Sequence, residues 1–375
     1  MIEWRKVKFL EVVQLNPRVS LTKGELYPFV EMSNAPIGSR YPENDVFQTF
    51  TGGGSKFEKR DTVIARIEPC LQNGKGFLSK YDKGFGSTEF LVFRPVNEEV
   101  MSYDFLYYFM GQQTIREAMA KTMVGASGRQ RVNNAFFNDL FITLPPLPVQ
   151  RRIAEALSRY DALIENYQRQ IKLLEEAAQR LYKEWFVDLR FPGHQSTPII
   201  NNLPQSWQKK SVNDVLTFHR GYDLTKNSFK NGKYPVVGST SILGYHCNYK
   251  IDGPGIVTGR SGSLGVYQLI WENFWPHNTS LYVSDFKGHD IFFIYCLLNT
   301  LDFTTLNSGG AIPSLNRNTL SNIEVLEPSM DLQDAFSRIV KPMFVKQRNL
   351  STQIRNLSEA RDRLLPKLMS AEIEV

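Results

Sequence analysis

Residues 149–186 read VQRRIAEALSRYDALIENYQRQIKLLEEAAQRLYKEWF, and this stretch decides the fold. Its apolar side chains recur at steps that alternate between four and three residues. An average step of 3.5 residues is the heptad period of a coiled-coil seam. The predicted seam residues are Ile153, Leu157, Tyr160, Ile164, Tyr167, Ile171, Leu174, Ala178, Leu181 and Trp185.

The same seam recurs near the C-terminus, with every residue 183 positions later and with Gln347 and Arg361 as polar interruptions. Each seam predicts a helix of roughly 48 Å, at 1.5 Å per residue. A lone helix would expose its apolar stripe, so we expect the two seams to bury each other. A pair of bundle helices inside an ordinary domain is the simpler alternative. The second seam consists of Phe336, Val340, Met343, Gln347, Leu350, Ile354, Leu357, Arg361, Leu364 and Leu368.

The composition is that of a globular protein with more basic than acidic residues. The chain has 375 residues, 42% hydrophobic and 22% charged, with a formal net charge of +6. This length allows two or three domains, and the charge suits a polyanionic partner. The N-terminal residues 1–9 lack the apolar core of a signal peptide, and the longest apolar run, Ile291–Leu298, is too short to span a membrane. Three scattered cysteines favour a reducing, cytoplasmic location.

Two regions around the helices alternate short strand-like runs with turn signals. In the first, residues 62–67 and 88–93 predict strands, and residues 103–113 predict a helix that extends toward residue 123. In the second, strands are expected at 234–237, 255–258, 265–270 and 280–283, with a helix at 291–298. The proline-rich residues 190–207 predict a linker.

The two regions resemble each other, so the whole chain reads as a duplication. Trp4 corresponds to Trp207, Asp61–Arg66 to Gly255–Arg260, and Pro145 to Pro328. A chain that leaves one domain along the first helix must return along the second. We therefore expect an α+β protein of two similar domains, separated by a pair of long antiparallel coiled-coil helices with a pseudo-two-fold relation. The predicted segments are domain one at 1–145, helix one at 146–188, a linker at 189–205, domain two at 206–328 and helix two at 329–375.

Several motifs together resemble one known family over nearly the whole chain. They are PPLPVQRRI (145–153), YKEWF (182–186), GSTEFLVF (86–93), WPHNTSLYV (275–283) and SGGAIPSLNR (308–317). They are similar to those of the DNA-specificity subunit of type I restriction–modification systems. The second helix departs from the pattern, because no Arg-Arg pair follows Gln333 and Pro342 lies in its early turns.

The resemblance implies that each domain is a target-recognition domain that reads one half of an interrupted DNA sequence. It also implies that the helices act as a ruler and dock two methyltransferase (modification) subunits, which restriction/translocase subunits join. S-adenosylmethionine, ATP and magnesium are then implied for the partner subunits, and no cofactor for this chain. The helix flank of Leu163, Leu173, Tyr182 and Phe186 is the expected docking surface.

Catalytic signatures are not convincing in the sequence itself. The run FTGGG (50–54) fits a methyl-donor loop, but residues 55–61 leave no room for the helix that should follow before the next strand. The only Pro-Pro follows Leu144, which does not match the catalytic tetrapeptide of DNA methyltransferases, and no phosphate-binding loop occurs. Five histidines show no metal-ligand spacing. We expect a binding protein without a catalytic or metal site; an enzyme that methylates DNA alone is the rival.

DNA reading requires basic side chains for phosphates and polar side chains for base edges. Arg66 and Arg260 rank highest because they lie at matching places in the two domains. A structural adaptor that pairs two proteins through its helices is an alternative, and it would show no salt-dependent DNA binding. The candidate DNA-binding residues are Lys56, Arg60, Arg66, Gln72, Lys75, Arg129, Arg131, Arg220, Lys226, Ser239, Arg260, Ser263, His277 and Asn278.

Overall fold

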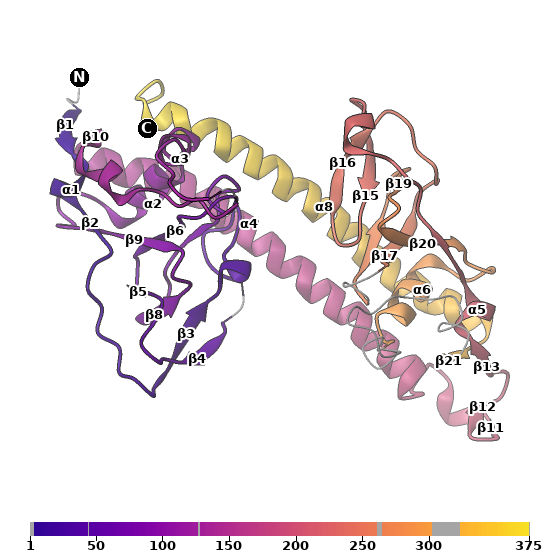
Figure 1. Cartoon of the computed structure of the whole chain (residues 1–375). Coiled ribbons are helices and arrows are strands. Elements are labelled where there is room, and N and C mark those ends of the chain that lie inside the picture. The colour runs from indigo at the N-terminus through magenta and orange to yellow at the C-terminus, as the bar shows by residue number, and fades with distance from the viewer. Residues whose placement is uncertain (1–3, 44, 127, 261–264, 302–322, 375) are drawn as a thin grey trace. The chain divides into compact units, whose positions relative to one another are not determined.

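The chain folds into two compact units, each of which contains part of both long helices. The structure is a computed structural model that describes residues 4–43, 45–126, 128–260, 265–301 and 323–374. Unit 1 comprises Met1–Arg169 with Leu350–Val375, and unit 2 comprises Gln170–Asn349. The long helices are α4 (Leu147–Tyr182) and α8 (Met330–Met369) (Figure 1).

Unit 1 contains a two-stranded sheet and two four-stranded sheets. Strand β1 (Arg5–Lys8) pairs antiparallel with β10 (Phe141–Leu144), which leads directly into α4. One four-stranded sheet has the order β2 (Val13–Leu15), β9 (Phe90–Pro95), β6 (Thr62–Ala65) and β7 (Gly76–Leu78). The other has the order β4 (Phe47–Thr49), β3 (Leu26–Val30), β8 (Lys83–Gly86) and β5 (Ser55–Glu58).

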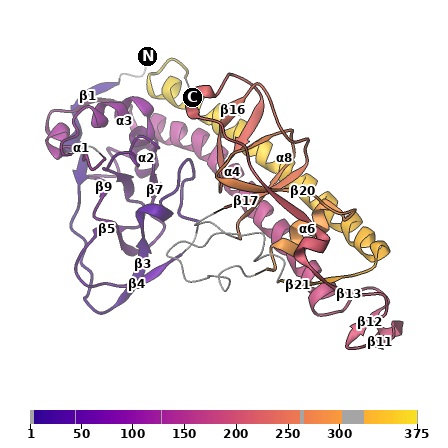
Figure 2. The same cartoon turned by 45° about the vertical axis from the view of Figure 1, so that its right-hand side comes forward.

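Three helices complete unit 1: α1 (Phe9–Val12), α2 (Tyr103–Gly111) and α3 (Gln113–Ala120). The predicted helix from residue 103 onward is interrupted, because Gln112 adopts an extended conformation and begins a new helix. Both views show α2 and α3 beside the first part of α4 (Figures 1 and 2). The core of unit 1 joins α2 to Leu157 of α4 and Leu368 of α8, so the helix seam is part of the domain core.

Unit 2 repeats this plan. Strand β13 (Gln208–Ser211) pairs antiparallel with β21 (Glu324–Glu327), which leads into α8. A four-stranded sheet has the order β14 (Thr217–Arg220), β20 (Ser280–Asp285), β17 (Gly255–Gly259) and β18 (Tyr267–Ile270). A three-stranded sheet has the order β16 (Ile242–His246), β15 (Tyr234–Val237) and β19 (Trp275–Pro276). Its described residues also form the α-helices α5 (Val212–Val215) and α6 (Ile291–Leu298).

The duplication predicted from sequence is therefore confirmed at the level of topology. The order β2-β9-β6-β7 corresponds to β14-β20-β17-β18, and the parallel pair β3–β8 corresponds to β15–β19. Helix α6 has the predicted bounds because Asp290 accepts hydrogen bonds from the N–H groups of its first turn. Its residues Phe292–Leu298 are all buried, as expected for a helix that is apolar on every side.

The two long helices pair antiparallel within each unit. Unit 1 contains the start of α4 and the end of α8, whereas unit 2 contains the end of α4 and the start of α8. Among the seam residues, Ile153, Leu157 and Ile164 are buried in unit 1, while Phe336 of α8 contacts the rings of Tyr182 and Trp185 in unit 2. The α+β class with a long helix pair is thus confirmed, and α8 continues through Pro342.

One expectation for the end of α4 needs correction. Tyr182 and Phe186 are buried, because their rings pack on Phe293 and Phe336, so neither belongs to an exposed docking flank. A π-helical turn, η3 (Lys183–Val187), directs Phe186 inward. The proline-rich segment that follows contains a small hairpin of β11 (Ile199–Ile200) and β12 (Leu203–Pro204).

Candidate nucleic-acid interface

The two highest-ranked arginines occupy equivalent backbone positions in the two units. Strand β6 pairs with β9 up to Ala65 and Phe90, and the next residue, Arg66, donates its N–H to the carbonyl of Glu89 at 2.8 Å. Strand β17 pairs with β20 in the same manner, and Arg260 donates its N–H to the carbonyl of Thr279 at 3.2 Å. We call these two places the Glu89 edge (Arg66 with residues 86–89) and the Thr279 edge (Arg260 with residues 276–279).

The Glu89 edge has two arginines nearby, of which Arg131 forms an ion pair and Arg66 does not. Arg131 forms a bidentate ion pair with Glu89, at 2.6–2.9 Å, and Glu89 raises the pKa of Arg131. Arg66 is half-buried, and its Nε has no hydrogen-bond partner among the residues that the structure describes. The Arg66 carbonyl accepts from the N–H of Val132, so the segment that carries Arg131 is fixed beside Arg66. The Arg66 guanidinium thus forms no ion pair with the described residues, and its Nε is buried.

The loop after Arg66 brings further polar residues to the same end of the sheet. The backbone carbonyl of Lys75 accepts a hydrogen bond from the N–H of Ala65 at 3.0 Å. The side-chain ammonium of Lys75 donates to the carbonyl of Met32 at 2.7 Å. The exposed Gln72 donates its side-chain amide to Glu68 at 2.8 Å. These two side chains are thus partly occupied by protein acceptors.

Two other predicted residues of unit 1 are also near this edge. Lys56 lies opposite Phe85, next to the start of the edge at Gly86, and its ammonium is 5.0 Å from the ring centre of Phe50. Arg129 is exposed, and its carbonyl accepts from the Arg131 guanidinium at 3.2 Å. Lys56 is thus on the strand that pairs with β8 just before the Glu89 edge, and Arg129 is next to the segment that carries Arg131.

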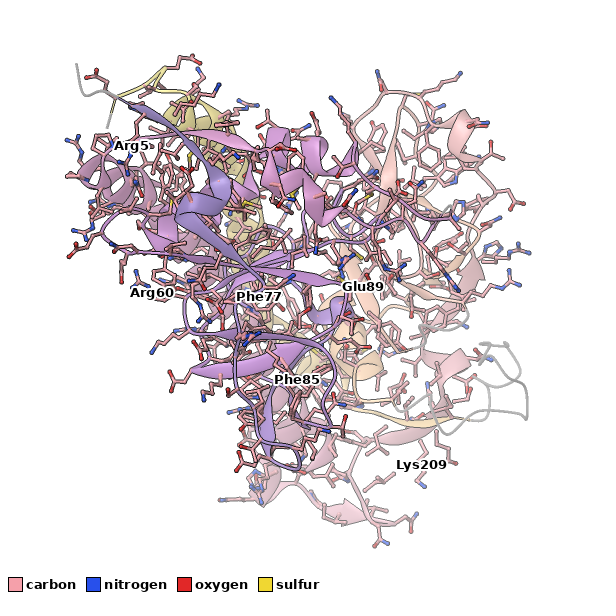
Figure 3. All side chains as sticks on the ribbon, turned by 60° about the vertical axis from the view of Figure 1, so that its left-hand side comes forward. Arg5, Arg60, Phe77, Phe85, Glu89 and Lys209 are labelled. Atoms are coloured by element: carbon pink, nitrogen blue, oxygen red, sulfur yellow. The ribbon has the colours of Figure 1, made fainter. Side chains whose placement is uncertain are left out.

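Arg60 does not belong to the Glu89 edge. It lies in the turn before β6, whereas Arg66 follows β6, and Figure 3 shows Arg60 and Glu89 on opposite sides of Phe77. Its guanidinium pairs with Glu98 at 2.6 Å and is 4.4 Å from the ring centre of Tyr103. Arg60 thus connects the sheet to α2, and the sequence-based expectation that it reads DNA lacks support from its position.

The Thr279 edge is built from a dense set of local hydrogen bonds. Ser239 donates its hydroxyl to the carbonyl of Thr279 at 2.8 Å. His277 contacts the Thr279 hydroxyl at 3.0 Å and the Leu224 carbonyl at 3.1 Å. Asn278 donates its side-chain amide to Asp223. These bonds fix the loop, while the exposed Arg260 side chain has no ion pair with the described residues.

Arg220 ends β14 opposite Leu281 and is exposed at the same end of the sheet. Lys226 begins a short helix, η5 (Lys226–Ser228), but its side chain lies outside the described residues. Ser263 lies outside the described residues altogether, as does the motif at 308–317.

Sequence reasoning missed an aromatic cluster beside the Thr279 edge. Lys250 places its ammonium 5.0 Å from the ring centre of Trp275 and 5.5 Å from that of Tyr222. The Tyr222 and Tyr282 hydroxyls are 3.0 Å apart, and burial, with this hydrogen bond, raises the pKa of Tyr282. His219 stacks on Tyr222. The available signal was Trp275 at the start of the WPHNTSLYV motif; Tyr222 and Lys250 are distant in sequence and meet only in the fold.

Metal and membrane features were also sought in the described parts of the chain. Within residues 4–43, 45–126, 128–260, 265–301 and 323–374, no group of three or more His, Cys, Asp or Glu side chains is placed to hold a metal ion. None of the helices described is long and apolar enough to cross a membrane.

The two units have the same topology, each places an arginine directly after an equivalent strand, and both contain parts of α4 and α8. These features define a protein with two similar recognition domains. Residues 1–176 and 204–358 match the type I restriction modification DNA specificity domain, so the chain belongs to this family and is a DNA specificity subunit of the type I restriction–modification class.

Individual relatives agree with this assignment. The chain is 27% identical over 301 residues to the type I restriction enzyme MjaIX specificity subunit of Methanocaldococcus jannaschii, covering 72% of this chain and 69% of that one. It is 22% identical to the HindI specificity subunit of Haemophilus influenzae, covering 84% and 87% of the two chains. The fold is similar to that of the S subunit from M. genitalium, with a TM-score of 0.58, 17% identity and coverage of 98% and 96%.

Proposed function

We propose that the chain reads a bipartite DNA target with the Glu89 edge for one half and the Thr279 edge for the other. The carrying observation is the equivalence of Arg66 and Arg260, whose guanidinium groups form no ion pair with the described residues. A guanidinium without a protein acceptor is suited to guanine edges or phosphates. The backbone N–H of each arginine donates to the neighbouring loop, at Glu89 or at Thr279, and this hydrogen bond fixes the backbone from which the side chain extends.

The surroundings of the two arginines differ, which suits two different half-sites. Arg66 lies beside the Glu89–Arg131 pair, whereas Arg260 lies beside Thr279 and His277. A carboxylate accepts hydrogen bonds only, while hydroxyl and imidazole groups both donate and accept. The two edges therefore present different hydrogen-bonding patterns on one shared frame.

The helices supply spacing and assembly in this proposal. Leu163 and Leu173 of α4 are 43% and 57% exposed, and Ile339 of α8 is 44% exposed, so apolar side chains remain on the helix surfaces. We assign these surfaces to two methyltransferase subunits, with restriction/translocase subunits joining the complex. The chain itself is non-catalytic and cytoplasmic, and S-adenosylmethionine, ATP and magnesium act in the partner subunits.

An exchange of domain two tests the reading of half-sites. Residues 206–328 are replaced by the second domain of another family member, and the methylated motif is sequenced in cells that also carry the methyltransferase subunit. One half of the motif should change and the other should stay. A change of both halves together would contradict independent reading. Mass measurement of the co-expressed complex should give two methyltransferase subunits per chain, and a one-to-one complex would contradict the docking proposal.

A further inference from the structure

The polar interruption of the second seam forms a buried ion pair in unit 1. Arg361 of α8 contacts Asp161 of α4 at 2.6 Å, and their side chains are only 12% and 2% exposed. The same guanidinium donates to the carbonyl of Gly38 at 2.7 Å and pairs with Asp362 at 2.9 Å. Burial lowers the pKa of Arg361, but the charge of Asp161 and its hydrogen bond raise that pKa by more, so the guanidinium stays charged.

Domain one contributes to this pair through α2. Tyr108 donates its hydroxyl to the second oxygen of Asp161 at 2.5 Å. Burial raises the pKa of Tyr108, and the charge of Asp161 raises it further, so the hydroxyl keeps its proton as a donor. Both oxygens of the buried carboxylate are thus satisfied, one by α8 and the other by domain one.

The equivalent place in unit 2 is apolar. The residue 183 positions before Arg361 is Ala178, and the residue 183 positions after Asp161 is Phe344. Ala178 and Phe344 are 1% and 3% exposed and belong to one core cluster. Tyr295, the counterpart of Tyr108 on α6, contacts Phe344 with ring centres 5.4 Å apart. At matching places of the repeat, unit 1 therefore has the charged pair Asp161–Arg361 and unit 2 has the apolar residues Phe344 and Ala178.

This difference determines what each helix can pair with. In an antiparallel pair of two α4 helices at the same register, each Asp161 would face Ala178 of the other copy. In a pair of two α8 helices, each Arg361 would face Phe344. In the first arrangement the buried Asp161 loses its cationic partner, and in the second Arg361 loses its buried carboxylate and keeps only the exposed Asp362 on its own helix. Removing one partner of a buried ion pair is strongly unfavourable. Buried polar residues fix partner choice in coiled coils by this mechanism.

We propose that the Asp161–Arg361 pair makes α4 select α8, and excludes pairing of either helix with the same helix of a second copy of this chain. The other seam positions are apolar in both repeats except at Gln347, although only three of the ten matched pairs are identical. Apolar packing tolerates changes of size and has no direction, so it discriminates weakly between the intramolecular pair and a pair of identical helices. The buried Asp161–Arg361 pair discriminates between these two arrangements, because only the α4–α8 pairing brings the two opposite charges together.

The test refolds the full-length chain from guanidinium over a wide range of protein concentrations, because the pairing choice is made during folding. The double variant D161F/R361A gives unit 1 the residues that unit 2 has at the same places. The expected result is a folded chain whose dimeric and larger species increase by more than about tenfold over the wild type, measured by light scattering after size separation. The control E359A/R363A removes an exposed pair of α8 and should remain monomeric.

A variant with the two charges exchanged, D161R/R361D, separates an effect on partner choice from a general loss of packing around residues 161 and 361. It keeps opposite charges across α4 and α8, so it should refold as a monomer. A monomeric D161F/R361A at every concentration would overturn the proposal, as would oligomers of D161R/R361D. If D161F/R361A does not fold, D161L/R361A replaces it with a smaller side chain. Failure of both to fold would mean that the pair is required for folding rather than for partner choice, which also overturns it.

Discussion

The side chain of Gln150 accepts a hydrogen bond from the N–H of Ser102 at 2.8 Å, which ties the start of α4 to the residue that precedes α2. Its amide nitrogen donates to the carbonyls of Val100 and Pro145, both at 2.8 Å. Gln150 is fully buried. One side chain thus satisfies three backbone groups at the point where domain one joins its long helix.

Gln333 occupies the equivalent place in unit 2 and is also fully buried. Its Nε2 donates to the carbonyl of Pro328 at 2.9 Å, and its Oε1 accepts from His289, which precedes the capping residue of α6, at 2.9 Å. Hydrogen bonds are directional, whereas apolar packing is not. We infer that these glutamines set the angle at which each long helix leaves its domain.

Replacing Gln150 with Ala should lower the free energy of unfolding by about 3 kcal/mol, because three buried backbone groups lose their partner. Thermal unfolding followed by calorimetry measures the change. Replacing the exposed Gln353 of α8 with Ala is the control and should leave the unfolding temperature unchanged. Equal unfolding temperatures for Gln150→Ala and the wild type would show that other groups satisfy these backbone atoms.

Replacing Arg260 with Ala should weaken binding of the target DNA by the assembled complex by about 1–3 kcal/mol, provided that the side chain contacts a base pair. If it contacts a phosphate, all sequences should weaken equally and the slope of affinity against salt should decrease by about one. Fluorescence anisotropy at several salt concentrations separates these outcomes. Lys59→Ala, which changes an exposed lysine with a loose 3.8 Å ion pair, is the control. If the affinity of Arg260→Ala equals that of the wild type, the Thr279 edge is not part of the DNA interface.

Replacing Glu165 of α4 with Gln should stabilise the protein at neutral pH, because the ionised carboxylate is disfavoured in the native state. Burial raises the pKa of Glu165, and Asp161 raises it further, against the opposing charges of Arg40, Arg169 and Lys80. Its Oε1 is buried without a hydrogen-bond partner among the described residues.

The pH dependence of Glu165→Gln follows from the raised pKa of Glu165. The native state binds the Glu165 proton more tightly than the unfolded state, so wild-type stability rises as pH falls through that raised pKa. The Gln variant lacks this rise, and its advantage should shrink toward acid pH. Urea unfolding at a series of pH values checks this, with the exposed Glu155→Gln as the comparison. An advantage that stays constant with pH would contradict the assigned cause.

Adding one heptad after Gln170 and one after Gln353 should lengthen both helices by roughly 10 Å while keeping both seams in phase. We expect a methylated motif with the same half-sites and a spacer longer by about 3 bp. Methylation sequencing reads the spacer directly. A heptad after Gln170 alone should break the helix pairing and abolish methylation. An active double insertion with an unchanged spacer would show that the helices do not set the distance.

The sequence by itself determined the duplication and the long helices. A heptad seam is a local pattern, because helical geometry alone decides which residues share a face. Repetition of the seam 183 residues later then revealed the internal repeat. The equivalence of Arg66 and Arg260 was predictable for the same reason, since each follows a recognisable buried strand.

Only the tertiary structure decided which polar residues meet. Asp161 lies outside the predicted seam, and its partner Arg361 is 200 residues away, so no local period could pair them. Tyr182 and Phe186 were expected on the surface, but the α6 side chain Phe293 and the α8 side chain Phe336 cover them. Arg60 pairs with Glu98 and contacts the ring of Tyr103 on α2, and its predicted contact with DNA stays a prediction. Periodicity shows which residues share one face of an element, whereas the neighbours of that face are set by packing between segments distant in the chain.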